Sequence, residues 1–350
     1  QAEMDTLGAT FNSRGHRIAP LLHQADLVVV NSCCVTGMAE SKTRRLVRRI
    51  TRVAPDAQVL VTGCLVQRDP AAFNGLRAVR WVVDNGRKPD IVDIVESDVF
   101  GAAGAPAAVR RCLGTGGRTR VLVKIQEGCD QRCAYCIVPF VRGRARSRSV
   151  EDILGECRRA LADGARELVV TGTHIGCFGD GRGGGLSTLL EQLVALEGDY
   201  RVRLSSLEPG DLSEQLLELV CGHPRVCPHL HVSVQSLCAD TLRSMNRRAD
   251  GLDRLVGRLA ALRARHDSLA LGGDFIVGFP GETHEHFTVT LRNAQRASFT
   301  HGHVFGYSKR PGTSASAMPR QVDGTEKARR NRLLRDLIAH QHLAFLRSQA

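Results

Sequence analysis

Residues 121–136 read VLVKIQEGCDQRCAYC and carry the strongest structural signal in the chain. The first five residues are mostly β-branched or apolar and predict a strand. Cys129, Cys133 and Cys136 follow that strand in a C-x3-C-x2-C spacing, with Tyr135 before the last cysteine. A structural zinc site needs four closed ligands, usually from C-x2-C pairs, and no second pair lies nearby. Three thiolates instead suit a 4Fe–4S cluster that keeps one iron open for a small molecule, which predicts a catalytic loop.

The rest of the chain beyond this loop repeats a strand–helix pattern. Strand-like segments occur at 120–125, 167–171, 201–205, 229–234, 271–277 and 300–305, with helical stretches between them. Alternating strands and helices form parallel sheets, whose ligands bind at the carboxyl ends of the strands. Six units are too few for a closed eight-unit barrel, so residues 119–320 predict a partial (β/α)6 barrel. Residues 321–350 predict a final helix that begins with a capping box of Asp323 and Glu326.

The first 100 residues predict a separate parallel α/β domain. Strand-like runs at 26–31, 57–62 and 80–84 accompany a basic helix at 38–53. Cys33 and Cys64 each follow one of these runs, at the sheet edge where ligands bind in open α/β folds, so the two thiols could share a ligand. Buried structural cysteine is the alternative interpretation. Residues 101–118 are rich in Gly, Ala, Pro and Arg and predict a linker between the two domains.

Composition narrows the class of protein. The 350 residues include 48 Lys and Arg against 36 Asp and Glu, a net charge of +12 that favours a polyanionic partner, with an Arg-rich overall composition as the alternative. Twelve cysteines without a secretory signal favour metal or redox chemistry over disulfides. No apolar run approaches the about 18 residues of a membrane span, so we expect a cytoplasmic protein with no membrane partner. Because the chain opens on Gln1, we expect residues to precede it.

Several further motifs bring the sequence close to one family. The three-cysteine loop resembles that of the radical S-adenosylmethionine enzymes, and the chain is similar nearly end to end to the methylthiotransferases among them. One departure is that Leu237 and Cys238 stand where the family usually has Gly-Ser. The matching motifs are Asn31-Ser32-Cys33, Thr62-Gly63-Cys64, Glu127-Gly128-Cys129, Leu204-Ser205-Ser206, His229-Leu230-His231, Gln235-Ser236 and Gly278-Phe279-Pro280-Gly281-Glu282.

The resemblance implies two 4Fe–4S clusters and S-adenosylmethionine as cofactors. Cys129, Cys133 and Cys136 would hold the cluster that cleaves S-adenosylmethionine to a 5′-deoxyadenosyl radical. Cys33 and Cys64 would hold an auxiliary cluster that carries the transferred sulfur, with a third cysteine expected before Gln1. The family also implies an electron donor, a sulfur donor and a carboxyl-terminal RNA-binding domain beyond the final helix. An unactivated carbon needs radical chemistry, because acid–base groups alone would not suffice.

The same resemblance suggests which residues contact the cofactor. For these side chains, ordinary loop-capping polarity is the alternative. His229 and His231 lie on a strand with apolar neighbours, so we expect one of them to face inward, as a core histidine or a functional one. The residues implied in cofactor binding are Tyr135, Thr171, Gly172, Thr173, Glu208, Ser233, Gln235, Val277 and Gly278.

Three segments suggest the substrate. The loop at 172–179, which contains His174, and the segments at 141–148 and 304–313 resemble the group that modifies threonylcarbamoyl-adenosine. That implies transfer of a methylthio group to C2 of N6-threonylcarbamoyladenosine at position 37 of tRNA. The alternatives are isopentenyl-adenosine in tRNA, an aspartate of a ribosomal protein, or a non-catalytic zinc-bearing RNA-binding module.

A basic segment follows the three-cysteine loop and is a candidate RNA contact. Its guanidinium groups would grip phosphates of the tRNA anticodon stem-loop and make binding sensitive to salt. A solvated basic loop is the alternative interpretation. The four residues are Arg142, Arg144, Arg146 and Arg148.

Overall fold

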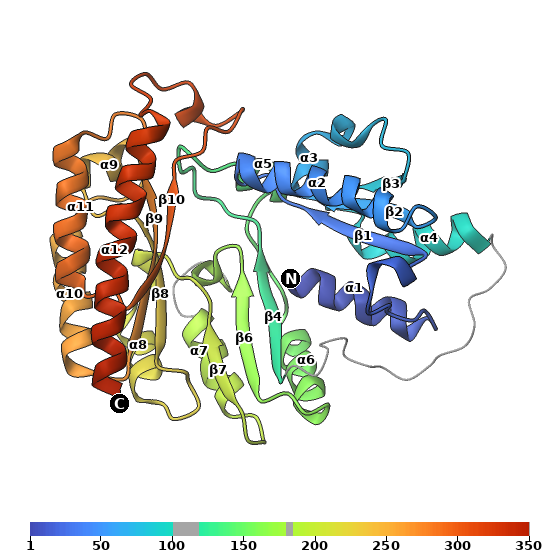
Figure 1. Ribbon diagram of the computed structural model, residues 1–350. Coiled ribbons are helices and arrows are strands. Elements are labelled where there is room, and N and C mark those ends of the chain that lie inside the picture. Colours follow the sequence, from blue (N-terminus) through green and yellow to red (C-terminus); the bar gives the residue numbers. More distant parts are fainter. Residues whose placement is uncertain (101–118, 180–184, 350) are drawn as a thin grey trace. The chain divides into compact units, whose positions relative to one another are not determined.

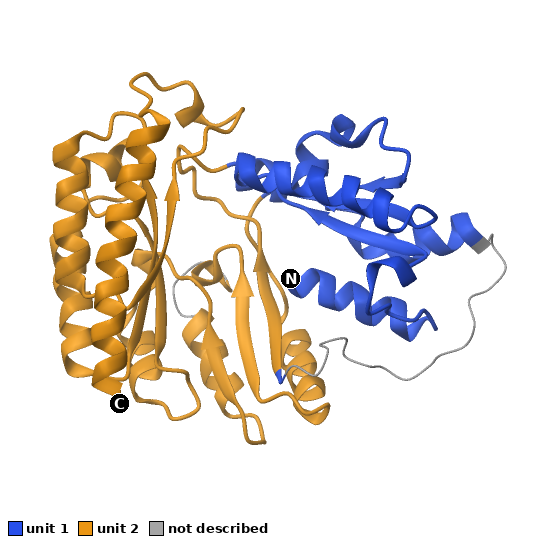
Figure 2. Ribbon diagram, viewed as in Figure 1, with its two compact units in different colours: residues 1–119, 137–143 blue, residues 120–136, 144–350 orange. Residues whose placement is uncertain are grey.

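The computed structural model describes residues 1–100, 119–179 and 185–349 (Figure 1). The chain divides into two compact units, residues 1–119 with 137–143 and residues 120–136 with 144–350 (Figure 2). The segment 137–143, directly after the three-cysteine loop, thus belongs to the first unit, which sequence order alone did not indicate. The predicted linker at 101–118 lies outside the described residues. Among the described helices, none is long and apolar enough to cross a membrane.

The first unit contains the predicted parallel sheet. Its three strands lie in the order β1 (Leu27–Ser32), β2 (Gln58–Gly63) and β3 (Val79–Val83), and all neighbours run parallel. Alternate residues of β2 face opposite apolar clusters, because side chains of a strand alternate between its faces. The helices are α1 (Ala2–Ser13), α2 (Gly37–Val53), α3 (Cys64–Arg68), α4 (Ile91–Phe100) and α5 (Val138–Arg142), with 3-10 turns at Leu22–Gln24, Pro70–Phe73 and Lys88–Asp90.

Helix α2 is the basic helix that the sequence predicted. Thr36 caps it, since its Oγ1 accepts a hydrogen bond from the Ala39 N–H at 3.1 Å. Val47 and Ile50 are fully buried against the sheet, whereas most of the arginines of the helix are exposed. The charge therefore lies on the solvent face, as the amphipathic pattern indicated.

The second unit confirms the partial barrel. Six parallel strands follow one another, and β-bridges Val202–Val226 and Leu207–Val232 join the half formed by β4, β6 and β7 to the half formed by β8, β9 and β10. A short strand, β5 (Arg146–Ser147), pairs antiparallel with the end of β4. The six strands are β4 (Arg120–Glu127), β6 (Glu167–Gly172), β7 (Arg201–Leu204), β8 (His229–Gln235), β9 (Ala270–Val277) and β10 (His301–Gly306).

Helices cover these strands and close the main apolar core. Figure 1 shows α10, α11 and α12 side by side against β8, β9 and β10. The helices are α6 (Val150–Ala162), α7 (Gly185–Val194), α8 (Glu214–Gly222), α9 (Ala239–Ser244), α10 (Leu252–Arg265), α11 (His284–Ala297) and α12 (Gly324–Gln349). Short 3-10 turns lie at Ile175–Cys177, Pro209–Asp211 and Ser314–Ser316.

The final helix α12 packs into the second unit. Leu334 and Ile338 are buried in its core. Asp323 caps the helix as predicted, because its Oδ1 accepts from the N–H groups of Thr325 and Glu326. The reciprocal half of the predicted capping box is replaced, since the Glu326 carboxylate binds Arg329 and Arg330 instead.

Candidate active site

The three predicted cluster ligands all lie in the loop that follows β4. Cys129, Cys133 and Cys136 are all half-buried, and the Cys136 N–H donates to the Cys133 carbonyl at 3.0 Å. Ala134 anchors the loop from both sides: its N–H donates to the Met245 carbonyl and its carbonyl accepts from Ala315, each at 2.8 Å. Two distant segments of the chain thus hold the three thiols at the carboxyl end of a barrel strand.

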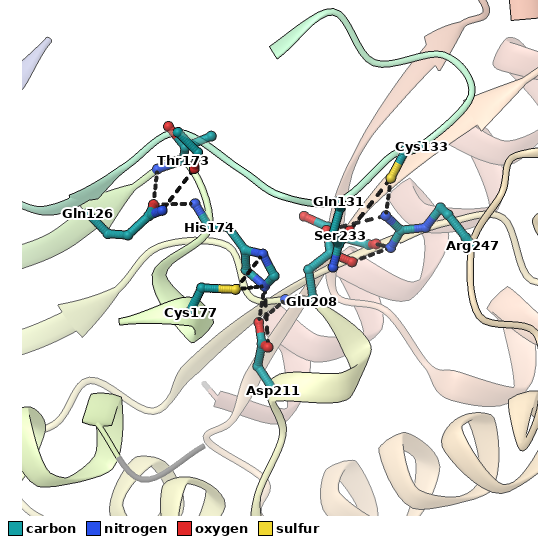
Figure 3. Close-up of polar contacts among 11 residues, drawn as sticks. Gln126, Gln131, Cys133, Thr173, His174, Cys177, Glu208, Asp211, Ser233 and Arg247 are labelled. Atoms are coloured by element: carbon teal, nitrogen blue, oxygen red, sulfur yellow. Dashed lines mark hydrogen bonds and ion pairs between the residues drawn. The ribbon is translucent and has the colours of Figure 1, made fainter. Parts of the chain in front are cut away.

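Gln126 ties this loop to the neighbouring loop after β6. Its Oε1 accepts from the Thr173 and His174 N–H groups at 3.1 and 2.8 Å, and its Nε2 donates to the Gly128 carbonyl at 2.8 Å (Figure 3). The side chain is 1 % exposed, so all of its polar atoms are paired inside the protein. Sequence reasoning missed Gln126, because nothing local separates it from any other strand residue.

His174 is a buried cation of the same loop. Its Nε2 lies 3.0 Å from Asp211 Oδ2, and the Cys177 Sγ lies 3.1 Å from its Nδ1 (Figure 3). Burial favours the neutral ring, but hydrogen bonds to Asp211 and Cys129 outweigh it and raise the pKa of His174 to about 12. At neutral pH the imidazolium therefore lies beside Cys129, one of the three predicted cluster ligands.

Arg247 forms a second charged group at the three-cysteine loop. It makes a two-pronged ion pair with Glu208 and donates to the Ser233 carbonyl at 2.6 Å (Figure 3). Its Nη1 also lies 3.6 Å from Cys133 Sγ and 3.4 Å from the Tyr135 hydroxyl. Burial opposes its charge, yet neighbouring anionic groups keep the pKa of Arg247 above the ordinary value. Sequence reasoning missed this residue too.

A polar cavity of about 330 Å³ opens at the carboxyl ends of these strands. Two larger hollows, of about 540 and 670 Å³, lie over outer helices and contain none of the cysteines of either predicted cluster. The smaller cavity is the candidate site because its lining includes His174 and Glu208, which hold the cysteine loop. It is lined by Thr171, Gly172, Thr173, His174, Ser205, Ser206, Glu208, Ser233 and Asp274, five of which the sequence predicted as cofactor contacts.

The other predicted cofactor residues lie outside that lining. Tyr135 is half-buried, and burial raises the pKa of its hydroxyl well above the ordinary value. Gln235 adopts a left-handed φ of 61°, which is rare for a side chain of its kind. Val277 is fully buried, and Gly278 has φ 69° with Lys327 so close that a Cβ would lie 2.2 Å from its Cγ. A cofactor role for these residues stays a prediction.

The departure from the family at Leu237 and Cys238 lies in the protein interior. Leu237 is fully buried in the main core and Cys238 is 4 % exposed. The Cys238 N–H donates to the Ser236 Oγ at 3.2 Å, which fixes the turn into α9.

In the first unit, Cys33 and Cys64 follow adjacent parallel strands, as predicted. Ser32 pairs with Gly63 in the sheet, so the two cysteines leave the same edge. The Cys64 thiol accepts a hydrogen bond from Arg142 Nε at 3.3 Å. The pKa of Cys64 is lowered to about 6. The largest cause is a hydrogen bond from Cys34; burial opposes it, and the positive charge of Arg142 lowers the pKa further. Cys34, the neighbour of Cys33 in the chain, is thus a direct partner of Cys64.

These groups fit iron–sulfur clusters by their chemistry. Thiolate sulfur is the cluster ligand, and a thiol with a pKa of about 6 is largely deprotonated at neutral pH. The three thiols of the β4 loop are half-buried beside Arg247 and His174, cations that favour a bound anionic cluster.

The four candidate RNA-binding arginines differ in their surroundings. Arg142 binds Cys64 and Glu3, and Arg148 donates to the Lys124 carbonyl and pairs with Glu156, both at 2.7 Å. Arg144 is 91 % exposed, and Arg146 is exposed on β5. Phosphate contact therefore stays a prediction that fits Arg144 and Arg146 better than the other two.

His229 and His231 lie on the same face of β8, because residues two apart on a strand share a face. His231 is buried and His229 is half-buried, so one of the two faces inward, as expected.

Comparison with known proteins places these features in a family context. The radical SAM superfamily matches residues 123–294, and a family described as "Uncharacterized protein family UPF0004" matches residues 1–83. A threonylcarbamoyladenosine tRNA methylthiotransferase MtaB of Thermotoga maritima is 34 % identical over 96 % of this chain and 78 % of its own. The Bacillus subtilis protein of the same name is 33 % identical, over 94 % and 75 %.

Two further comparisons mark the range of the similarity. A tRNA-2-methylthio-N(6)-dimethylallyladenosine synthase of Desulfitobacterium hafniense is 32 % identical over 94 % of this chain and 77 % of its own. Among solved structures, the radical S-adenosylmethionine methyltransferase TsrM of Kitasatospora setae superposes with a TM-score of 0.62 at 16 % identity, covering 89 % of this chain and 67 % of that one. The structural match supports the barrel fold alone.

Proposed function

This chain belongs to the radical SAM methylthiotransferases, and we propose that it adds a methylthio group to C2 of N6-threonylcarbamoyladenosine at position 37 of tRNA. The family makes it a transferase that uses a 4Fe–4S cluster and S-adenosylmethionine. The substrate is the finer part of the proposal. It is supported by the His174 loop and by relatives named for threonylcarbamoyladenosine.

The observation that carries the proposal is the joint position of the thiols and the polar cavity. His174 lines the cavity and hydrogen-bonds to Cys129. Glu208 lines it too, and its partner Arg247 reaches Cys133. A small polar molecule in the cavity would therefore lie close to a cluster held by the β4 loop.

The chain offers a set of ligands for each cofactor. Cys129, Cys133 and Cys136 would hold the cluster, and the cavity would hold S-adenosylmethionine through Thr171, Gly172, Thr173, Glu208 and Ser233. When bound, these groups supply a radical that can act on an unactivated carbon.

The protein residues around the cluster and S-adenosylmethionine would orient these two groups and shield them from water. Gln126 fixes the cysteine loop against the Thr173 loop, and Arg247 fixes Glu208 at the cavity wall. Because these polar groups are buried and paired, their geometry is set before any ligand arrives, which avoids reorganisation at the moment of reaction.

An auxiliary cluster in the first unit is part of the same proposal. Cys33 and Cys64 are its proposed ligands, supported by the lowered pKa of Cys64 and by its contact with Arg142. A sulfur donor and an electron donor would have to act with the enzyme. The tRNA would be gripped by exposed cations such as Arg144 and Arg146.

Nucleoside analysis tests the substrate. The chain would be expressed in a bacterial strain that lacks its own methylthiotransferases, beside a Cys129→Ala, Cys133→Ala, Cys136→Ala triple variant and a matched Cys221→Ala control on α8. We expect 2-methylthio-N6-threonylcarbamoyladenosine with the wild type and the control, and none with the triple variant. Detection of the methylthio derivative of isopentenyl-adenosine instead, the product type named for the Desulfitobacterium hafniense relative, would contradict the proposed substrate but not the class of enzyme.

A further inference from the structure

Four histidines and an aspartate gather on three adjacent strands of the second unit. His229 and His231 come from β8, Asp274 from β9, and His301 and His303 from β10. The rings lie close together, with centroids 5.1 Å apart for His229 and His301 and 5.5 Å apart for His231 and His301. The proposed transfer reaction does not use these imidazoles.

The sheet register explains why three of the imidazoles converge. His231 and His301 both pair with Gly272, one from each side, so the three residues form one row across β8, β9 and β10. A Cβ at Gly272 would lie 2.2 Å from His301 Nε2 and 2.4 Å from His231 Nδ1. Only glycine at the centre of the row leaves room for both nitrogens to approach the same point.

The nitrogen positions match a metal site. His229, His231 and His301 each offer a ring nitrogen, and these atoms all lie within 4.8 Å of one another. His229 Nε2 and His301 Nε2 are 3.2 Å apart. Two nitrogens on one tetrahedral zinc ion, each at about 2.0–2.1 Å, would be roughly 3.3 Å apart.

The environment keeps these rings in the form that a metal needs. Burial is the main cause that lowers the pKa of both His229 and His301 to about 4, so both are neutral near pH 7 with a lone pair available. The positive charge of Arg203, whose Nε donates to Glu167 at 2.8 Å, adds to this lowering at His229. The Leu204 backbone is a hydrogen-bond neighbour of the His229 ring, whose Nε2 faces His301.

Asp274 supplies the outer partner that metal-binding histidines usually have. Its Oδ1 lies 3.1 Å from His231 Nε2, a close contact without the alignment of a hydrogen bond, and His231 Nδ1 is turned toward the row at Gly272. Carboxylates in this position orient a ligating imidazole and raise its basicity. His303, whose side chain is 65 % exposed, binds the same carboxylate oxygen at 3.0 Å.

We propose that His229, His231 and His301 form a binding site for a divalent transition-metal ion, separate from the iron–sulfur ligands. Three imidazoles suit zinc and leave a fourth position for water. The site is independent of the proposed tRNA substrate, and it would hold even if that substrate were wrong.

Metal content gives the first test. Protein whose cysteines have been loaded with iron and sulfide would be incubated with one equivalent of Zn²⁺, desalted and assayed for zinc and iron. We expect wild type and the exposed control His340→Ala to retain about one zinc per chain, and His301→Ala to lose most of it with iron unchanged. Equal zinc in His301→Ala and wild type, or no retained zinc in wild type, would overturn the site.

X-ray absorption at the zinc edge of the wild type keeps the test decisive if His301→Ala does not fold. We expect a first shell of nitrogen or oxygen at about 2.0–2.1 Å with the outer-shell pattern of imidazole. A shell dominated by sulfur at about 2.3 Å would assign the zinc to cysteines and refute the proposal.

Discussion

At the scale of single residues, the polar groups that hold the cysteine loop depend on complete pairing. The Arg247 side chain is 7 % exposed and that of Glu208 is 21 % exposed, so removal of one partner leaves the other charge unpaired in a largely buried position. Breaking such a pair costs more than the pair itself contributes, because the remaining charge has lost its water and its partner.

We therefore expect Arg247→Met to lower the free energy of unfolding by about 3 kcal/mol. Chemical denaturation measures this change in the free energy of unfolding. The cluster-free protein is used so that loss of a cofactor does not contribute to the result. Arg243→Met is the control, since Arg243 and Asp240 are both more than half exposed and their pair contributes at most about 1 kcal/mol. Adding Glu208→Gln to Arg247→Met should recover part of the loss, and an equal or larger loss would contradict this account.

The Cys64 thiol gives a second prediction at this scale. Its pKa of about 6 lies below the ordinary value of 9.0, so the thiolate stabilises the fold at high pH, and that contribution disappears as pH falls from about 9 through 6. We expect the thiolate absorbance near about 240 nm, taken as wild type minus Cys64→Ala, to rise around pH 6.

Arg142→Met tests one cause of that shift, the cation that comes after the Cys34 hydrogen bond. It removes one of the cations that favour the thiolate, so the midpoint should move upward. A midpoint that stays near 9 in the cluster-free wild type would refute the lowered pKa.

At the scale of elements, the turn from β2 into α3 depends on Gly63. Its φ is 100°, and a Cβ would lie 2.4 Å from both Asn31 Oδ1 and the Ser32 carbonyl oxygen. Close approach of β1 to this turn is what places Cys33 and Cys64 at one sheet edge.

We expect Gly63→Ala to destabilise the protein by clearly more than Gly75→Ala. Gly75 also has a positive φ, 79°, but nothing lies within 4 Å of a Cβ there, so its substitution costs only the backbone strain of about 1–2 kcal/mol. The difference between the two variants in urea denaturation measures the steric clash together with the backbone strain of Gly63, whose φ of 100° and ψ of −170° lie in a region that essentially only glycine adopts. Equal losses would show that the sheet edge yields to the added methyl group.

At the scale of the whole molecule, the net charge of +12 makes salt the natural probe of RNA binding. Removal of one phosphate-binding cation should reduce the slope of log affinity against log salt by about 1. We expect Arg144→Ala with Arg146→Ala to flatten the slope for tRNA by about 2, measured by filter binding or fluorescence anisotropy. The control is Arg158→Ala with Arg159→Ala on α6, and an equal effect of both pairs would assign the binding to net charge instead.

Patterns along the chain were sufficient to predict the barrel strands and to single out the proposed cluster ligands. The six barrel strands begin and end within two residues of their predicted bounds, because β-branched runs and helical periodicity are local properties. The cysteine spacing is local as well, so it was enough to predict Cys129, Cys133 and Cys136 as cluster ligands. The two cysteines of the first unit needed only the rule that parallel strands end at one edge.

The partners that surround these cysteines lay beyond sequence reasoning. Arg247 reaches Tyr135 across 112 positions of sequence, and Gln126 reaches His174 across 48. Such pairs are formed by packing and by burial of polar groups, and neither produces a periodic pattern in the amino-acid sequence.

The sequence by itself determined the fold class, the strand order along the chain and the identity of the three-cysteine loop, because each depends on residues close together in the chain. Only the tertiary structure decided that the Cys34 thiol hydrogen-bonds to Cys64, that Arg142 belongs with the first unit, and that His229, His231 and His301 converge over Gly272. The physical reason is that sheet register and side-chain burial bring distant residues within hydrogen-bond range, and both are set by the folded core as a whole.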